Sequence, residues 1–203
     1  MRALDEIKKL AKEASLKDFD CAAREACEHI LKMEPSNDAF LFRLAESLLG
    51  LGLFSKAEAV LKLIEKVPDS KKWRVSLLRA EVAAGLHKIE LANEFYREAL
   101  SLKPERTYTW VFYAAFLAKQ EKFEPAIKVL ESCLAAKATG DRDEVFYLLG
   151  AYRMVLREYS RAREALERAI CLANNNYPEA QQCLEDLEFL DSLSTQVGGD
   201  FRR

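Results

Sequence analysis

Between residues 38 and 72 the apolar positions predict two amphipathic helices joined by a short turn. The first helix carries its apolar side chains at the i, i+3, i+4 and i+7 spacing of one helix face: Phe40, Leu41, Leu44, Leu48 and Leu51. Gly50 and Gly52 interrupt this helix. A second apolar stripe then continues through Ile64, and Pro68 is expected to end the second helix.

The same pair of helices recurs along the chain with a period of about 34 residues. Each copy has a small residue on its first helix: Ala11, Ala45, Ala80, Ala114 and Gly150. Each copy also has an alanine twelve residues later, on its second helix: Ala23, Ala57, Ala92, Ala126 and Ala162. We expect these positions to mark the point where the two helices cross, because larger side chains would overpack it.

This pattern resembles the tetratricopeptide repeat, a helix-turn-helix unit of 34 residues. The fifth copy carries the most motif positions: Phe146, Leu149, Gly150, Tyr159, Ala162, Leu166 and Ala169. The fourth copy has Trp110 at the aromatic position of the motif, whereas the third has Ser76 there, and Ile7 and Leu41 replace it in the first two. The resemblance implies an all-α fold, a right-handed superhelical α-solenoid of tandem helix-turn-helix repeats.

One solenoid of five repeats is therefore expected over residues 4–193. The predicted repeats are 4–37, 38–72, 73–106, 107–142 and 143–176, followed by a capping helix over 177–193. The apolar stripe of that last helix would cover the exposed face of the fifth repeat: Ala180, Cys183, Leu184, Leu187 and Leu190. We expect residues 194–203, with two adjacent glycines, to form a disordered tail.

Polar residues at the predicted repeat boundaries favour helix capping. The segments 35–38, 104–107 and 139–141 each contain Pro or Gly together with Ser, Thr, Asn or Asp. Such residues end one helix and offer side-chain oxygens to the first amides of the next.

Composition and charge narrow the class of protein further. Half of the residues are hydrophobic and 32% are charged, with only 7 Gly and 5 Pro, which favours long helices over many short strands. The 31 basic and 33 acidic residues are mixed along the chain, so no cationic surface for nucleic acid is predicted. The sequence has no signal-peptide pattern and no long apolar run, and we expect a cytoplasmic protein without a membrane span.

The residues that usually carry chemistry do not form a recognisable site. His29 and His87 lie in different repeats, and the five cysteines include no Cys-x-x-Cys pair, so we expect reduced thiols and no metal site. Neither a phosphate-binding loop nor a Gly-x-Ser-x-Gly elbow is present. The sequence therefore predicts a protein that is not an enzyme and holds no cofactor.

In tetratricopeptide repeat proteins the first helices line a concave surface that binds other polypeptides. The resemblance implies that the second, fifth, ninth and twelfth residues of each repeat contribute to it. The candidate peptide-binding residues are Phe42, Leu49, Arg74, Leu77, Tyr108, Val111, Tyr147 and Met154. This set predicts an adaptor or chaperone-like scaffold for an extended or helical apolar segment of a partner. A stripe at this spacing also suits a core, so each residue could instead pack between neighbouring first helices.

Three other uses of the repeats compete with this one. A carboxylate clamp for acidic C-terminal tails is disfavoured, because only Lys8 and Arg74 match its basic positions and its asparagines are missing. A bacterial secretion-type repeat chaperone is an alternative, although those proteins usually have three repeats. A self-associating structural component is the other alternative, with a homodimer formed through Leu4, Ile7 and Leu10 at the N-terminal end.

Overall fold

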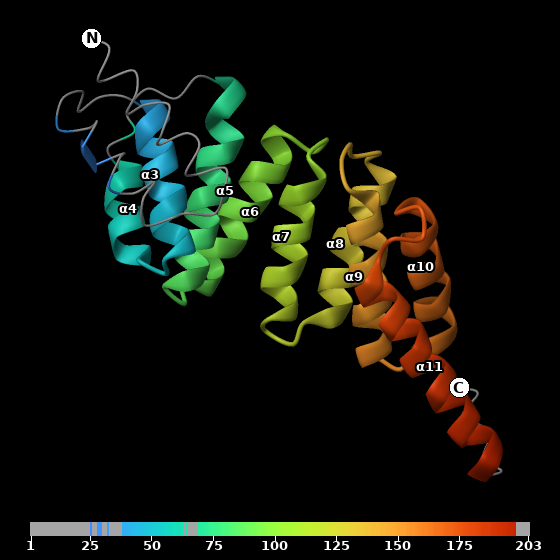
Figure 1. The fold of residues 1–203 in the computed structure, drawn as a ribbon. Helices are drawn as coiled ribbons and strands as arrows, with labels where there is room; N and C mark the ends of the chain where they lie inside the picture. Colours follow the sequence, from blue (N-terminus) through green and yellow to red (C-terminus); the bar gives the residue numbers. More distant parts are fainter. Residues whose placement is uncertain are drawn as a thin grey trace. The chain divides into compact units, whose positions relative to one another are not determined.

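The computed structural model describes residues 25, 28, 29, 32, 38–62, 64 and 69–197 (Figure 1). These residues form nine α-helices and no strand, apart from an isolated bridge between Arg106 and Thr139, which confirms the expected all-α fold. The chain divides into two compact units, Met1–Lys103 and Pro104–Arg203. Most of the predicted first repeat, the N-terminal residues proposed for a homodimer and residues 198–203 lie outside the described residues.

The first unit contains two helix pairs. Helix α3 (Asp38–Gly50) packs against α4 (Phe54–Lys62), and α5 (Asp69–Gly85) packs against α6 (Ile89–Leu102). The apolar faces of α3, α4 and α5 share one core, in which Leu41, Leu61 and Leu78 are buried.

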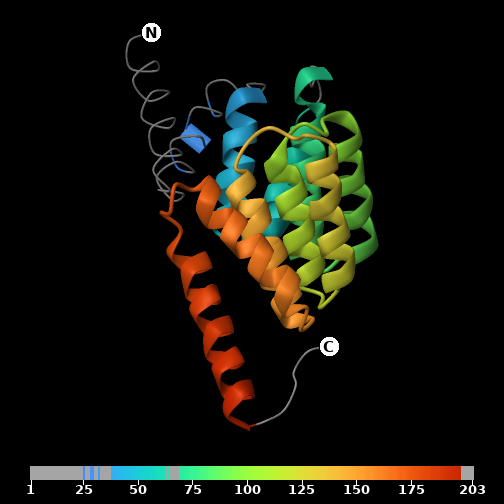
Figure 2. The same ribbon diagram turned by 90° about the vertical axis from the view of Figure 1, so that its right-hand side faces the viewer.

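The second unit contains two further pairs and a closing helix. Helix α7 (Thr107–Ala118) packs against α8 (Phe123–Ala135), and α9 (Arg142–Val155) packs against α10 (Tyr159–Leu172). The closing helix α11 (Pro178–Val197) lies against α10 along its first half and then continues past it (Figure 2).

The small residues of the described pairs are all buried, which agrees with their predicted place between the two helices. Ala45, Ala80, Ala114 and Gly150 are all buried, as are the alanines twelve residues later. A Cβ atom added to Gly150 would lie 2.6 Å from Cγ of Leu166 and 3.2 Å from the carbonyl oxygen of Ala162. The repeat period therefore reflects the spacing of these close contacts.

The turn inside each described pair reverses the chain at a residue with positive φ: Gly52 (70°), His87 (58°), Glu121 (60°) and Arg157 (61°). Each lies five residues before the buried alanine of the second helix. The Gly52 amide donates to the Leu49 carbonyl at 2.9 Å, and the Leu53 amide donates to the Leu48 carbonyl at 2.8 Å. Equivalent bonds close the other three turns, which makes each a Schellman motif.

The connection between α8 and α9 is tied back to the segment just before α7. The backbone amide of Thr139 donates to the Glu105 carbonyl oxygen at 2.9 Å, and its hydroxyl donates to the same oxygen at 3.1 Å. Gly140, with φ of 135°, lies against the side chain of Thr107. We call the two bonds between Thr139 and Glu105 the Glu105–Thr139 clasp. The interval between successive alanines of the second helices is longest here, at 36 residues from Ala126 to Ala162.

Several predicted boundaries differ from the structure. Helix α5 begins at Asp69, four residues before the predicted repeat, because no helix-breaking residue lies between residues 69 and 73. Helix α4 ends at Lys62, so Ile64, which was predicted to belong to this helix, is buried but lies outside it. The closing helix reaches Val197 and includes four residues assigned to the disordered tail.

The predicted side-chain caps do not form at the helices whose caps are described. Asp141 occupies the N-cap of α9 without a side-chain hydrogen bond to its amides. Thr107 lies inside α7 and is buried, and no hydrogen-bond partner is found for its hydroxyl among the described residues. At the intra-repeat turns, the preceding Schellman motif fixes the chain instead, and the N-cap residues of α8 and α10 give no side-chain hydrogen bond.

Candidate peptide-binding surface

The candidate residues lie on the first helices of the described pairs. Helices α3 and α5 carry them in the first unit, and α7 and α9 carry them in the second. Each first helix turns one apolar face to its own unit, since the i, i+3, i+4 spacing gathers those side chains on one side. Whether a candidate residue can contact a partner depends on how much of it this packing leaves exposed.

In the first unit, the apolar candidates are largely enclosed. Phe42 and Leu77 are buried, and Leu49 is half-buried against the core of α3, α4 and α5. Of the four candidates on α3 and α5, Arg74 offers the most polar surface, because its guanidinium remains partly accessible. The first unit therefore presents charge, rather than the apolar surface that the sequence suggested.

Arg74 links the two first helices of this unit. Its Nε donates to Oε1 of Glu46 at 3.0 Å, and its Nη2 donates to the same carboxylate oxygen. The guanidinium carbon also lies 6.0 Å from the centre of the Phe42 ring, within the range of a cation–π contact. Arg74 is one of the predicted surface residues, and its contact with Glu46 holds α3 beside α5.

Glu81 adds a carboxyl group to the same side of α5, seven residues after Arg74. Burial, and then the nearby negative charge of Glu46, raise the pKa of Glu81 to about 7. Burial and the charge of Glu81 in turn raise the pKa of Tyr96 on α6. Near neutral pH the first unit thus holds a carboxyl group that is protonated in part of the molecules.

In the second unit, α7 exposes two aromatic side chains. Tyr108 is 37% exposed and Phe112 is 43% exposed, whereas Val111 between them is buried. The two rings meet edge to face, with their centres 5.7 Å apart and their planes at 87°. We call Tyr108 and Phe112 the α7 aromatic pair. Their i, i+4 spacing places both rings on one face of the helix.

The two candidates on α9 are covered by the closing helix. Tyr147 and Met154 are half-buried and pack against a core that includes Ala180 and Leu187 of α11. The ring of Tyr147 lies 5.1 Å from that of Tyr177, centre to centre. Burial raises the pKa of Tyr147 and raises that of Tyr177 to about 12, so both phenols stay neutral near pH 7. Tyr147 and Met154 therefore stabilise the packing of the closing helix at the end of the unit.

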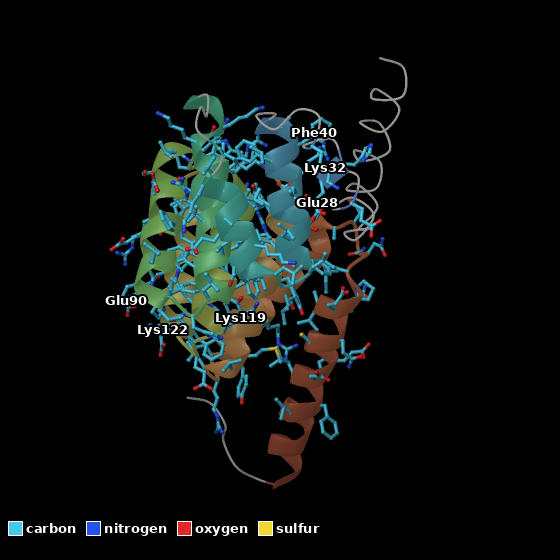
Figure 3. All side chains as sticks on the ribbon, turned by 90° about the vertical axis from the view of Figure 1, so that its left-hand side faces the viewer. Glu28, Lys32, Phe40, Glu90, Lys119 and Lys122 are labelled. Carbon is cyan, nitrogen blue, oxygen red and sulfur yellow. The ribbon has the colours of Figure 1, made fainter. Side chains whose placement is uncertain are left out.

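In the second unit, acidic residues lie at the start of the first helix α9, and basic residues lie at the end of the first helix α7. Asp143 and Glu144 lie in the first turn of α9, and burial together with Asp141 and Asp143 raises the pKa of Glu144. The other end of α7 carries Lys119, which is exposed near Lys122 at the turn to α8 (Figure 3). Between these ends, Ala115 is half-buried.

Phe112 was missed from the sequence. It follows Tyr108 by four residues, which is the signal that could have identified it. The prediction used the positions that usually line the concave surface, and Phe112 occupies a different one. The exposed side chains Phe189 and Leu190 of α11 were also missed, because the stripe of α11 was expected to be covered along its whole length.

The described residues form no cluster of three or more His, Cys, Asp or Glu side chains suited to a metal ion. His29 and His87 are exposed and far apart in the sequence. Cys133, Cys171 and Cys183 are free thiols, and burial raises the pKa of Cys133 to about 11. None of the described helices has both the length and the hydropathy needed to cross a membrane.

Comparison with known proteins bears on the fold. Residues 18–81 match the family model of the tetratricopeptide repeat. No curated protein sequence is detectably similar to the chain.

Solved structures of repeat proteins match most of the chain. TTC0263, a repeat protein of Thermus thermophilus, is 18% identical, with 91% of this chain and 98% of that one covered and a TM-score of 0.71. PilF of Pseudomonas aeruginosa is 23% identical, with 80% and 72% covered and a TM-score of 0.66. PilW, a widely conserved type IV pilus biogenesis factor, is 22% identical, with 75% and 69% covered and a TM-score of 0.61. At these identities the likeness concerns the fold.

Proposed function

The chain is a tetratricopeptide repeat protein, and we propose on that premise that it is a scaffold binding a segment of another protein through the α7 aromatic pair. The observation that carries the proposal is the exposure of Tyr108 and Phe112 on a first helix, beside the half-buried Ala115. Rigid aromatic side chains of this kind dominate the energetics of many interfaces.

The ligand suited to this face is an extended or helical apolar segment. Two neighbouring aromatic rings offer apolar area, and the edge-to-face contact holds them in one arrangement before binding. Removing about 200 Å² of apolar surface from water at about 25 cal/mol/Å² contributes roughly 5 kcal/mol before the costs of association. Lys119 at the far end of α7 would favour an acidic residue in the segment.

The test compares affinity purifications with the intact chain and with a Tyr108→Ala/Phe112→Ala variant. We expect the variant to lose the proteins that the intact chain captures, by at least about tenfold, since hot-spot residues commonly contribute this much. Both residues are exposed, so the melting temperature should change little.

The matched control is Leu172→Ala on α10, which removes a side chain of similar exposure from a second helix. Equal capture by the double variant and the intact chain would contradict the proposal. Tyr147→Glu does not separate binding from folding, because Tyr147 packs against Tyr177.

The finer assignments belong to the same proposal. The scaffold acts in the cytoplasm, in keeping with its free thiols, and protects its ligand in a chaperone-like manner rather than catalysing a reaction. Cell fractionation tests the first statement, and suppression of ligand aggregation tests the second. Self-association through the N-terminal end concerns residues outside the described part of the chain and stays an alternative.

A further inference from the structure

The closing helix extends beyond the unit that it covers. In its first half, Ala180 is buried and Leu187 is only 2% exposed, both in the core with α10. Immediately afterwards, Phe189 is 63% exposed and Leu190 is 42% exposed. Figures 1 and 2 both show the C-terminal half of α11 running past the ends of α9 and α10. Large apolar side chains thus continue on a segment that its own unit does not enclose.

This segment also carries a strong negative charge. Helix α11 contains five acidic residues and no Lys or Arg: Glu179, Glu185, Asp186, Glu188 and Asp191. Among the described residues, one of these carboxylates contacts a basic side chain: Glu188 lies 4.0 Å from Arg163. Glu185, Asp186 and Glu188 are exposed next to Phe189 and Leu190. We call these three carboxylates and the two apolar side chains together the α11 acidic–apolar surface.

Its charge decides among the classes of partner. Two α11 helices packed together would bring five negative charges against five, so charge repulsion disfavours a second copy of this helix. An anionic membrane surface would repel it for the same reason. A basic amphipathic helix satisfies both properties at once, because its apolar face covers the exposed side chains while its Lys and Arg residues meet the carboxylates.

We propose that the α11 acidic–apolar surface binds a basic amphipathic helix of another protein. Phe189 and Leu190 insert into the apolar face of that helix, and the carboxylates of Glu185, Asp186 and Glu188 pair with its basic residues. The charge pairs lie at the rim of the contact, so they raise the association rate and make binding weaken as salt is added. This surface is separate from the α7 aromatic pair, and neither proposal depends on the other.

The test measures fluorescence anisotropy of a labelled peptide of Leu and Lys about four turns long, patterned with the helical period. One comparison peptide replaces Lys by Glu, and another has the same composition in an order that gives no apolar face. We expect saturable binding of the first peptide by the full chain, weakening at high salt, and at least about tenfold weaker binding of the other two.

Two variants locate the contact. Phe189→Ser/Leu190→Ser should weaken binding by about tenfold or more, whereas Leu172→Ser on α10 should leave it unchanged. The triple change Glu185→Gln, Asp186→Asn and Glu188→Gln should weaken binding and remove most of its salt dependence. Glu164→Gln/Glu167→Gln, which neutralises two exposed carboxylates of α10, is the matched control.

Unchanged binding by Phe189→Ser/Leu190→Ser would overturn the proposal, as would equal binding of the Glu peptide. Sedimentation velocity of the same proteins tests whether a second copy of the chain binds this surface instead. A dimer that this double variant converts to a monomer would overturn it too, by assigning the surface to a second copy of the chain. The Tyr108→Ala/Phe112→Ala variant should bind the Lys peptide normally, which separates this result from the test of the proposed function.

Discussion

Single residues with positive φ set the angle at which each repeat folds back. Gly52 adopts this conformation without strain, whereas His87, Glu121 and Arg157 adopt it with a Cβ atom that opposes it. The two backbone hydrogen bonds of the Schellman motif and the packing of the buried alanine five residues later hold the backbone of these residues at positive φ. The three turns therefore carry a local cost that the rest of the repeat offsets.

Replacing Glu121 by Gly should raise the free energy of unfolding by about 0.5–1 kcal/mol, because the relief of strain exceeds the added entropy of the unfolded chain. The reciprocal change, Gly52→Ala, should lower it by about 1 kcal/mol, since no atom lies within 4 Å of the added Cβ and only the backbone opposes it. Urea denaturation followed by circular dichroism measures both. A stabilising Gly52→Ala would contradict this view of the turns.

The raised pKa of Glu81 makes stability depend on pH. Its carboxyl has a pKa of about 7 in the folded chain and about 4.5 when unfolded, so the folded state binds the proton more tightly. This contribution is fully present below pH 4.5 and is lost as the pH rises through 7. Glu81→Gln should therefore stabilise the protein at pH 8 by about 1–3 kcal/mol and flatten its stability between about pH 5 and 8.

Among the elements, the pair α9 and α10 is the described pair with a glycine at the small-residue position of its first helix. Gly150 lies against Leu166 and the backbone of Ala162, where the other described pairs place an alanine on the first helix. The larger side chains of one helix thus occupy the space that a small residue leaves on the other.

Gly150→Ala should lower the free energy of unfolding by about 1–2 kcal/mol. The new Cβ would lie 2.6 Å from Leu166, and this overpacking outweighs the better helix propensity of alanine, which is worth about 1 kcal/mol. A double-mutant cycle with Leu166→Ala checks the cause. In the Leu166→Ala background the same change should be neutral or stabilising, and an equal loss in both backgrounds would point to another contact.

The sequence predicts the helix pairs well because small residues and apolar stripes are local, periodic signals. It does not predict the positive φ of His87, Glu121 and Arg157, since glycine is the residue whose presence indicates this conformation. The end of α4 at Lys62 was also missed, because Ile64 continues the apolar spacing but is buried outside the helix. Helical periodicity reports which side chains are buried, and it does not distinguish the last turn of a helix from a buried segment after it.

On the scale of the whole molecule, the candidate surface was harder to predict than the fold. The eight predicted residues all lie on first helices, yet Phe42, Leu77 and Val111 are buried. Exposure depends on which neighbouring helix covers a position. For Tyr147 that neighbour is α11, whose path past the fifth repeat no local pattern encodes.

The two halves of α11 should respond differently to the same substitution. Leu187→Ala should lower the free energy of unfolding by about 2–4 kcal/mol, because it opens a cavity in the core with α10. Leu190→Ala should change it by no more than about 0.5 kcal/mol, since this side chain is already largely in solvent. Thermal and urea unfolding of the two variants gives both values. A large loss for Leu190→Ala would mean that the chain itself covers this end of the helix.

The Glu105–Thr139 clasp bears on how fast the second unit folds. It joins residues 34 positions apart, while each helix packs mainly on the next one or two in the sequence. Contacts between helices that are neighbours in the sequence close only short loops and therefore cost little entropy. We therefore expect the second unit to fold within milliseconds. The clasp joins the segment before α7 to the segment before α9, and both of its residues are exposed, so we expect the Thr139 amide to exchange with deuterium sooner than the amides in the buried parts of these helices. The part of α11 from Glu188 to Leu190, whose side chains are exposed, should exchange earlier still.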